Sequence, residues 1–178
     1  MQKVTDFEVG WLAGLIDGDG TISVYVRQPS PHHKSRAGAI IPHITITNCN
    51  PDLVECLHDL LNRIGVGHHI VWRKAERHYP SEGGHPIKRR EDIAHISMHG
   101  MKRVEKALDV VGNFLIGKKP QALLVREFIR YRKDPKTSAI PTARAIMTPY
   151  GDYEWELVEK IRSCQKGGKT NPDRKFWK

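Results

Sequence analysis

The sequence predicts an α+β fold whose elements follow the order α-β-β-α-β-β-α, with further helices toward the C-terminus. Two patterns favour this class. Long stretches carry apolar residues three and four positions apart, as amphipathic helices do, and shorter stretches alternate apolar with polar residues, as half-buried strands do. The alternating stretches come in two pairs, each between helical stretches. We therefore expect an antiparallel sheet with one apolar face and one polar face.

The first helix and the first strand pair lie in the N-terminal part of the chain. Thr5 and Glu8 form a capping box, which predicts a helix from about residue 6 to residue 17. TISVYVRQ (21–28) then alternates apolar and polar side chains, and IIPHITITN (40–48) repeats the alternation after a polar, Pro-rich loop. These segments predict two strands that share a polar face.

A second helix and a second strand pair follow. Asn50 and Pro51 are a favourable N-cap and first-turn pair, and Gly65 ends the apolar stripe that follows them. Residues 68–79 and 91–99 are expected to be strands on either side of a turn at SEGGHP.

The C-terminal part is expected to be helical with one long loop. The predicted helices cover residues 101–111, 120–132 and 152–165, and the loop covers 135–149. We assign residues 1–165 to a single domain and residues 166–178 to a basic C-terminal tail.

Charge and composition narrow the possible functions. A formal net charge of +9 favours a polyanionic partner, the alternative being a basic but inert surface. No apolar run approaches the roughly 18 residues of a membrane span, and the N-terminus lacks the layout of a signal peptide. The three cysteines are odd in number and fit no metal-binding spacing. We expect an intracellular protein with reduced thiols, no secretion signal and no membrane contact.

Three tempting motifs fail on context. DGDGTIS resembles the start of a calcium loop, but Ile22 and Gln28 stand where that loop needs Gly and Glu. GNFLIGKK nearly matches a phosphate-binding loop, but Lys119 replaces the required Ser or Thr and no strand precedes it. The ten histidines do not show the spacing of zinc ligands.

The stretch LAGLIDGDG combines two unfavourable features. Gly10, Gly14 and Gly18 recur every four residues, so one face of the helix is nearly bare, although each internal glycine costs about 1 kcal/mol. Asp17 and Asp19 stand at the helix C-terminus, where negative charge is disfavoured. A tightly packed core helix followed by an Asp-Gly turn is the simpler interpretation.

Close packing of two copies explains both features better. A glycine-lined face lets a second copy approach along a two-fold axis, which would bring both copies of Asp19 together. Such carboxylates repel each other unless a divalent cation lies between them. Mg²⁺, or another divalent cation such as Mn²⁺, suits hard oxygen ligands and phosphodiester chemistry.

LAGLIDGDG resembles the signature of the LAGLIDADG homing endonucleases, with Gly18 where that signature has alanine. The resemblance extends over about residues 6–132, through the order of elements and the segment FLIGKKPQA. A single motif resembles the homodimeric branch, whereas members with two motifs are monomers. The resemblance implies an αββαββα core and Mg²⁺-dependent cutting of both DNA strands across the minor groove of a long target site.

The resemblance also implies roles for individual residues. Asp19 would be a metal ligand from each subunit, and the Gly18 carbonyl would be a further metal contact. Lys118 matches a lysine near the scissile phosphates, and Asn48 matches a position, often Gln, that orders water. The expected dimer interface comprises Gly10, Ala13, Gly14 and Asp17, and Asp17 is also expected to cap or support the end of the helix.

Two sets of residues are expected to contact DNA. The polar strand faces should lie in the major groove and read bases. Their side chains are Ser23, Tyr25, Arg27, His43, Thr45, Thr47, Arg73, His95 and Ser97, although a register slip of one residue would exchange Arg73 for Trp72. The second set should contact phosphates or remain solvated, and comprises Arg36, Lys74, Arg77, Lys88, Arg89 and Arg90.

A binding protein of the same fold is the alternative to an enzyme, because fold does not settle function. It would be an intron-splicing RNA maturase or a non-catalytic DNA-binding regulator. The presence of both Asp19 and Lys118 favours the endonuclease. The resemblance further implies that such an enzyme is intron-encoded.

Overall fold

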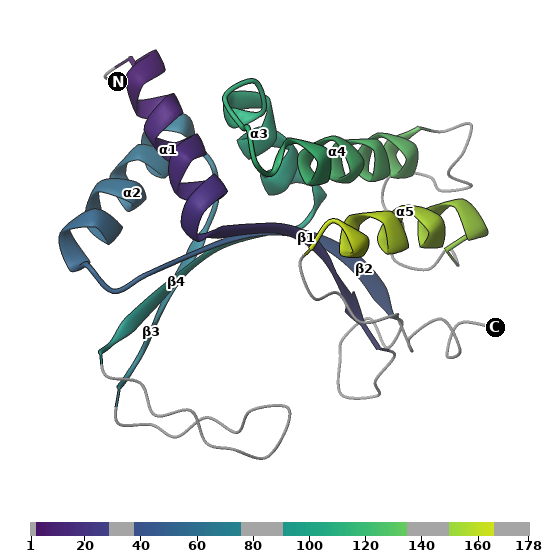
Figure 1. Cartoon of the computed structure of the whole chain (residues 1–178), viewed down its shortest axis with the longest axis horizontal. Helices are drawn as coiled ribbons and strands as arrows, with labels where there is room; N and C mark the ends of the chain where they lie inside the picture. The colour runs from purple at the N-terminus through teal and green to yellow at the C-terminus, as the bar shows by residue number, and fades with distance from the viewer. Residues whose placement is uncertain (1–2, 29–37, 76–90, 135–149, 166–178) are drawn as a thin grey trace.

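Helices cover one face of a four-stranded sheet (Figure 1). The computed structural model describes residues 3–28, 38–75, 91–134 and 150–165. In chain order the elements are α1 (Asp6–Asp19), β1 (Gly20–Arg27), β2 (Ala39–Asn48), α2 (Pro51–Ile64), β3 (His69–Arg73), β4 (Ile93–His99), α3 (Met101–Val111), α4 (Lys119–Lys133) and α5 (Asp152–Ser163). The predicted α+β class and order of elements are confirmed.

The sheet joins two hairpins. Its strand order is β1-β2-β4-β3, and every neighbouring pair is antiparallel. β2 and β4 lie at the centre, so the pairing between them joins the two predicted strand pairs into one sheet. Figure 1 shows the sheet curving beneath the helices, and none of the described helices lies on its other face.

The end of α1 differs from the prediction. The helix continues to Asp19 rather than ending at Asp17, because the Gly20 N–H still donates to the Ile16 carbonyl. A Cβ at Gly20 would lie 2.6 Å from that carbonyl oxygen, so the close turn from helix to strand requires glycine. Asp19 is thus the last helical residue, directly before β1.

Other boundaries shift by a few residues. β4 begins at Ile93 rather than residue 91, and α5 ends at Ser163 rather than residue 165. The predicted strand at 68–79 is shorter in the structure, where β3 ends at Arg73, and its residues 76–79 lie outside the described residues. The predicted loops at 29–37 and 135–149, the turn at 81–86 and the tail at 166–178 also lie outside them. In the described part of the chain, no helix is both long and apolar enough to cross a membrane.

The hydrophobic core lies between the helices and the sheet. One set of alternate strand residues joins the apolar faces of the helices, and both are almost completely buried. The largest fully buried side chains are Leu12, Ile16, Ile22, Ile44, Ile46, Leu57, Leu60, Leu61, Ile96, Met98, Leu108 and Phe128. Because the apolar strand face is enclosed in this way, the alternate, more polar residues are left on the helix-free face.

A buried ion pair attaches α5 to the rest of the chain. Arg132 of α4 donates to Glu154 of α5 at 2.8 Å, and their side chains are 5% and 4% exposed. The Arg132 guanidinium also lies 4.6 Å from the centre of the Tyr150 ring. The Tyr150 hydroxyl accepts from the Ile40 N–H at 2.9 Å, so the network reaches β2.

Breaking this pair should destabilise the protein strongly. Glu154→Gln leaves the Arg132 charge buried without its carboxylate, and we expect the free energy of unfolding in urea to fall by about 3 kcal/mol. Glu156→Gln, on the same helix, removes only the exposed pair with Lys160 and should cost below about 0.5 kcal/mol. Equal losses in the two variants would contradict a special role for the buried pair.

Candidate functional site

Polar side chains from neighbouring strands share the helix-free face. Thr45 at the centre of β2 lies opposite Thr21 of β1 and Ser97 of β4. Thr47 lies opposite His95, and its hydroxyl is 3.5 Å from the His95 ring nitrogen. By the register, all predicted base-reading positions fall on this face: Ser23, Tyr25, Arg27, His43, Thr45, Thr47, Arg73, His95 and Ser97.

The register of β3 resolves the ambiguity left by the sequence. Val71 lies opposite His95 and Arg73 opposite Ile93, which places Arg73 on the polar face. Trp72 lies opposite the buried Ala94 and therefore points to the other side of the sheet.

Two of the predicted DNA-contacting residues differ strongly in exposure. Ser23 is on the predicted face but only 5% exposed, because a short side chain opposite the larger His43 ring does not reach far from the sheet. Lys74 follows β3 and donates to Asp92 at 2.8 Å, and its side chain is still 70% exposed, so its expected contact with phosphate stays a prediction. Arg36, Arg77, Lys88, Arg89 and Arg90 lie outside the described residues.

Histidines form part of the polar face. The rings of His43 and His99 stack with their centres 5.8 Å apart. Burial, and then the neighbouring His99, lowers the pKa of His43. Burial lowers the pKa of His99 as well, with smaller contributions from His69 and Arg103. Both rings are therefore neutral at pH 7 and can act as hydrogen-bond donors and acceptors.

This histidine pair should make stability depend on pH. The folded-state pKa values lie below the ordinary 6.5, so on acidification the unfolded chain takes up protons first and the free energy of unfolding falls below about pH 6.5. Thermal unfolding at pH 7 and pH 5 should show a smaller decrease in Tm for His43→Gln than for the unaltered protein. An equal decrease in Tm for the two proteins would show that His43 does not contribute to the pH dependence.

The acidic end of α1 lies beside the end of β2. Asp19 is exposed, and the Asn48 side-chain N–H donates to its carboxylate at 3.4 Å. The Asn48 carbonyl oxygen in turn accepts from the Asn50 N–H at 2.9 Å, which orients the amide. The last turn of α1 contains no basic residue. The structure thus brings together Asp19 and Asn48, as predicted.

Lys118 reaches the same end of α1 from far along the chain. Its ammonium group donates to the Asp17 main-chain carbonyl. The Asp17 carboxylate accepts from the N–H groups of Ile116, Gly117 and Lys118 at 2.7, 3.1 and 2.8 Å. Burial raises the pKa of Asp17, but these three donors and the Lys118 charge outweigh it, and the pKa is lower than usual. All three predicted catalytic residues, Asp19, Asn48 and Lys118, therefore converge on one helix end.

The four residues predicted at the dimer interface differ in how accessible they are to a second chain. Ala13 is 1% exposed and belongs to the core of its own chain, and the Asp17 carboxylate is occupied by its own chain. A Cβ at Gly10 would lie 3.9 Å from Phe114, whereas Gly14 has nothing within 4 Å. Residues four apart drift by about 40° around a helix, which turns Gly10 away from the open face.

Large apolar side chains on and beside α1 were missed by the sequence prediction. Phe7 is 82% exposed, Ile116 is 87% exposed and Phe114 is 41% exposed. Phe114 and Ile116 lie in the apolar run FLIG, which gives no indication of which of its side chains remain exposed.

The donor set at the helix end suits a hard cation but is incomplete in one chain. Asp19 offers an accessible carboxylate with no cation from its own helix turn. Within the described ranges, no group of three or more His, Cys, Asp or Glu side chains could hold a metal ion. In the described part of one chain, Asp19 therefore does not belong to such a cluster.

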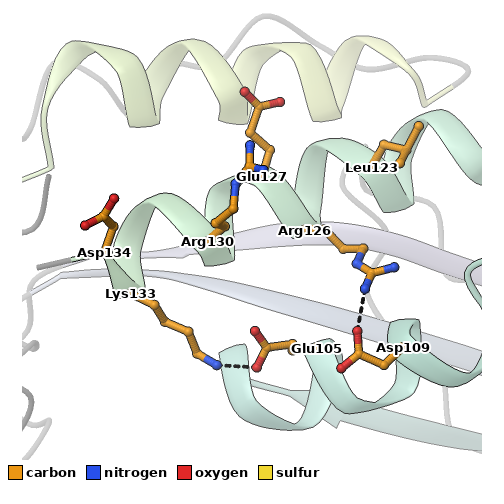
Figure 2. A pocket seen from close by; sticks show the side chains of 8 residues that line it. All are labelled: Glu105, Asp109, Leu123, Arg126, Glu127, Arg130, Lys133 and Asp134. Carbon is orange, nitrogen blue, oxygen red and sulfur yellow. Dashed lines mark hydrogen bonds and ion pairs between the residues drawn. The ribbon is translucent and has the colours of Figure 1, made fainter. Parts of the chain in front are cut away.

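One groove lies apart from this helix end. It has a volume of about 840 Å³ and runs along α3 and α4 (Figure 2). Figure 2 shows Lys133 reaching Glu105 and Arg126 reaching Asp109 across it. Because these charges are paired and the groove is remote from the polar sheet face, we do not assign it to the functional site.

No family model and no curated protein matches the sequence. Solved structures do match. The homing endonuclease I-CvuI in complex with its target has a TM-score of 0.58 at 20% identity, over 93% of this chain and 86% of that chain. The LAGLIDADG homing endonuclease I-SmaMI bound to cleaved DNA has a TM-score of 0.59 at 16% identity, over 98% of this chain and 48% of that chain.

A third structure gives the same result. The LAGLIDADG meganuclease I-CpaMI bound to uncleaved DNA has a TM-score of 0.58 at 18% identity, over 94% of this chain and 46% of that chain. The chain thus spans about half the length of I-SmaMI and I-CpaMI. Its fold is that of the LAGLIDADG homing endonucleases.

Proposed function

We propose that this protein is a site-specific DNA endonuclease that cuts both strands of a long target site, as a homing endonuclease does. The observation that carries the proposal is the convergence of Asp19, Asn48 and Lys118 at the end of α1, beside a polar sheet face that none of the described helices covers. An acid, a water-orienting amide and a cation are the groups that phosphodiester hydrolysis needs.

The proposed active form is a homodimer in which the α1 helices pack against each other. Gly14 and Gly18 have no atom within 4 Å of the position of a Cβ, so backbone could approach closely there. The exposed Phe7 and Ile116 would supply apolar contact area beside this helix. This chain covers 48% of I-SmaMI, which is consistent with two copies of it forming a unit as large as that longer chain. A two-fold axis through this face would bring the two Asp19 carboxylates together.

Asp19 of each subunit, with the Gly18 carbonyl, would hold Mg²⁺ or a similar divalent cation such as Mn²⁺. When bound, the ion would activate water and stabilise the leaving oxygen at the scissile phosphate. Asn48 would orient the attacking water, since its amide is held by the Asn50 N–H. Lys118 would neutralise charge that develops on the phosphate.

The polar sheet face would lie in the major groove of each half-site. Its curvature (Figure 1) suits the surface of a duplex. Arg27 and Arg73 can read guanine through two hydrogen bonds, whereas the threonines are less selective. The neutral His43 and His99 could donate to or accept from base edges.

Cleavage of a randomised duplex library tests the proposal. The purified protein is incubated with the library in Mg²⁺ and, separately, in EDTA, and the cut ends are sequenced. We expect double-strand breaks at one family of related sites in Mg²⁺ and none in EDTA. Sequence-specific retention of DNA without breaks, or binding of structured RNA alone, would instead favour the regulator or the maturase.

A further inference from the structure

One carboxylate connects the motif helix to a loop about 100 residues away in the sequence. The Asp17 side chain accepts three consecutive backbone N–H groups, from Ile116, Gly117 and Lys118, at 2.7, 3.1 and 2.8 Å. Both carboxylate oxygens take part, which fixes the orientation of the group. No side chain caps the start of α4, so Asp17 is the polar group that orders the chain just before that helix.

Lys118 is held by Asp17 at two points. Its backbone N–H donates to the Asp17 carboxylate, and its ammonium group donates to the Asp17 main-chain carbonyl. A lysine side chain is long and flexible, so directing its charge to one place costs conformational entropy. Because the Lys118 backbone is anchored to the same residue that its ammonium group binds, this entropy cost is smaller. The ammonium group is thereby held at Asp17, two residues before Asp19 in the sequence.

We propose that Asp17 is a positioning residue for Lys118 in the cleavage reaction. This inference rests on the proposed endonuclease function. It assigns the first acid of the motif a task within its own chain: holding residues 116–118 so that the Lys118 ammonium stays at the end of α1. The second acid, Asp19, remains free to act on the substrate.

A double-mutant cycle tests the coupling. Asp17→Asn keeps the size of the side chain but replaces one acceptor oxygen by an N–H₂ group that faces backbone donors. In single-turnover cleavage with enzyme in excess, we expect Asp17→Asn to slow the reaction about tenfold and Lys118→Ala about a hundredfold. The double variant should be no slower than Lys118→Ala, because a misplaced lysine cannot matter once it is absent.

Amide hydrogen exchange supplies a readout independent of activity. Exchange at Ile116, Gly117 and Lys118 should be faster in Asp17→Asn and unchanged in Lys118→Ala, whose backbone N–H is retained. Affinity for the target DNA should change less than twofold in either variant. Asp109→Asn, an equal charge change on the exposed pair with Arg126, should alter neither exchange at these amides nor cleavage. If Asp17→Asn does not fold, Asp17→Ser, which retains one acceptor, replaces it in the cycle.

The outcomes separate this inference from the function on which it rests. If the unaltered protein cuts its target, and the double variant cuts about a thousandfold more slowly because the two rate losses multiply, Asp17 does not act through Lys118. If exchange at residues 116–118 is unchanged in the Asp17 variant, the anchoring itself is wrong. If the unaltered protein cuts no DNA at all, the endonuclease proposal fails, and the positioning role fails with it.

Discussion

Replacing Asp19 by Asn should abolish DNA cleavage while leaving specific DNA binding intact. The substitution keeps the size of the side chain and the neighbourhood of Asn48, but it removes one ligand charge from each subunit. Loss of a metal ligand at a scissile phosphate should reduce the single-turnover rate by at least about a thousandfold. Binding could even tighten, because two carboxylates no longer repel the phosphates.

Cleavage of a cognate duplex in Mg²⁺, run beside a gel shift on the same preparation, measures both effects. Asp109→Asn is the matched control, since it makes the same chemical change at an exposed ion pair between α3 and α4 and should cut normally. A variant that cuts at the original rate would show that Asp19 is not a metal ligand. A variant that folds but no longer binds DNA would assign the acid a structural task and favour the binding-protein alternative.

Gly14→Leu should prevent assembly of the proposed dimer and, with it, cleavage. In the isolated chain nothing lies within 4 Å of a Cβ at Gly14, so leucine meets no obstacle inside the subunit. Leucine is also the better helix former by almost 1 kcal/mol, so each subunit should fold at least as stably as before. Between two closely packed helices, the added side chain would force the backbones apart.

Light scattering across micromolar concentrations, with and without DNA, gives the state of assembly. We expect a dimer for the unaltered protein and for Gly14→Ala, which adds one methyl group, and a folded monomer for Gly14→Leu. Circular dichroism confirms that the monomer retains its helices. An unaltered protein that stays monomeric even on DNA would overturn the proposed interface, as would a Gly14→Leu protein that still dimerises.

Local features of the sequence determined the helix ends and singled out the acidic motif. Thr5 caps α1 through the predicted reciprocal bonds with Glu8, and Asn50 caps α2 by accepting from two N–H groups. Gly65 adopts the left-handed conformation that ends α2. Each of these interactions spans only a few residues, so the residue types alone predict it. Asp19 was identified as a candidate metal ligand for a similar reason, because the residues of its motif are contiguous in the sequence.

The tertiary structure decided which strand face Arg73 occupies and what Asp17 binds. Pairing of β3 with β4 set the register that puts Arg73, rather than Trp72, on the polar face, and packing covered Ser23 on that face. Asp17, expected at a contact between subunits, binds residues 116–118 of its own chain. Register and side-chain partners of this kind depend on how segments distant in the sequence pack together, and no local pattern records that packing.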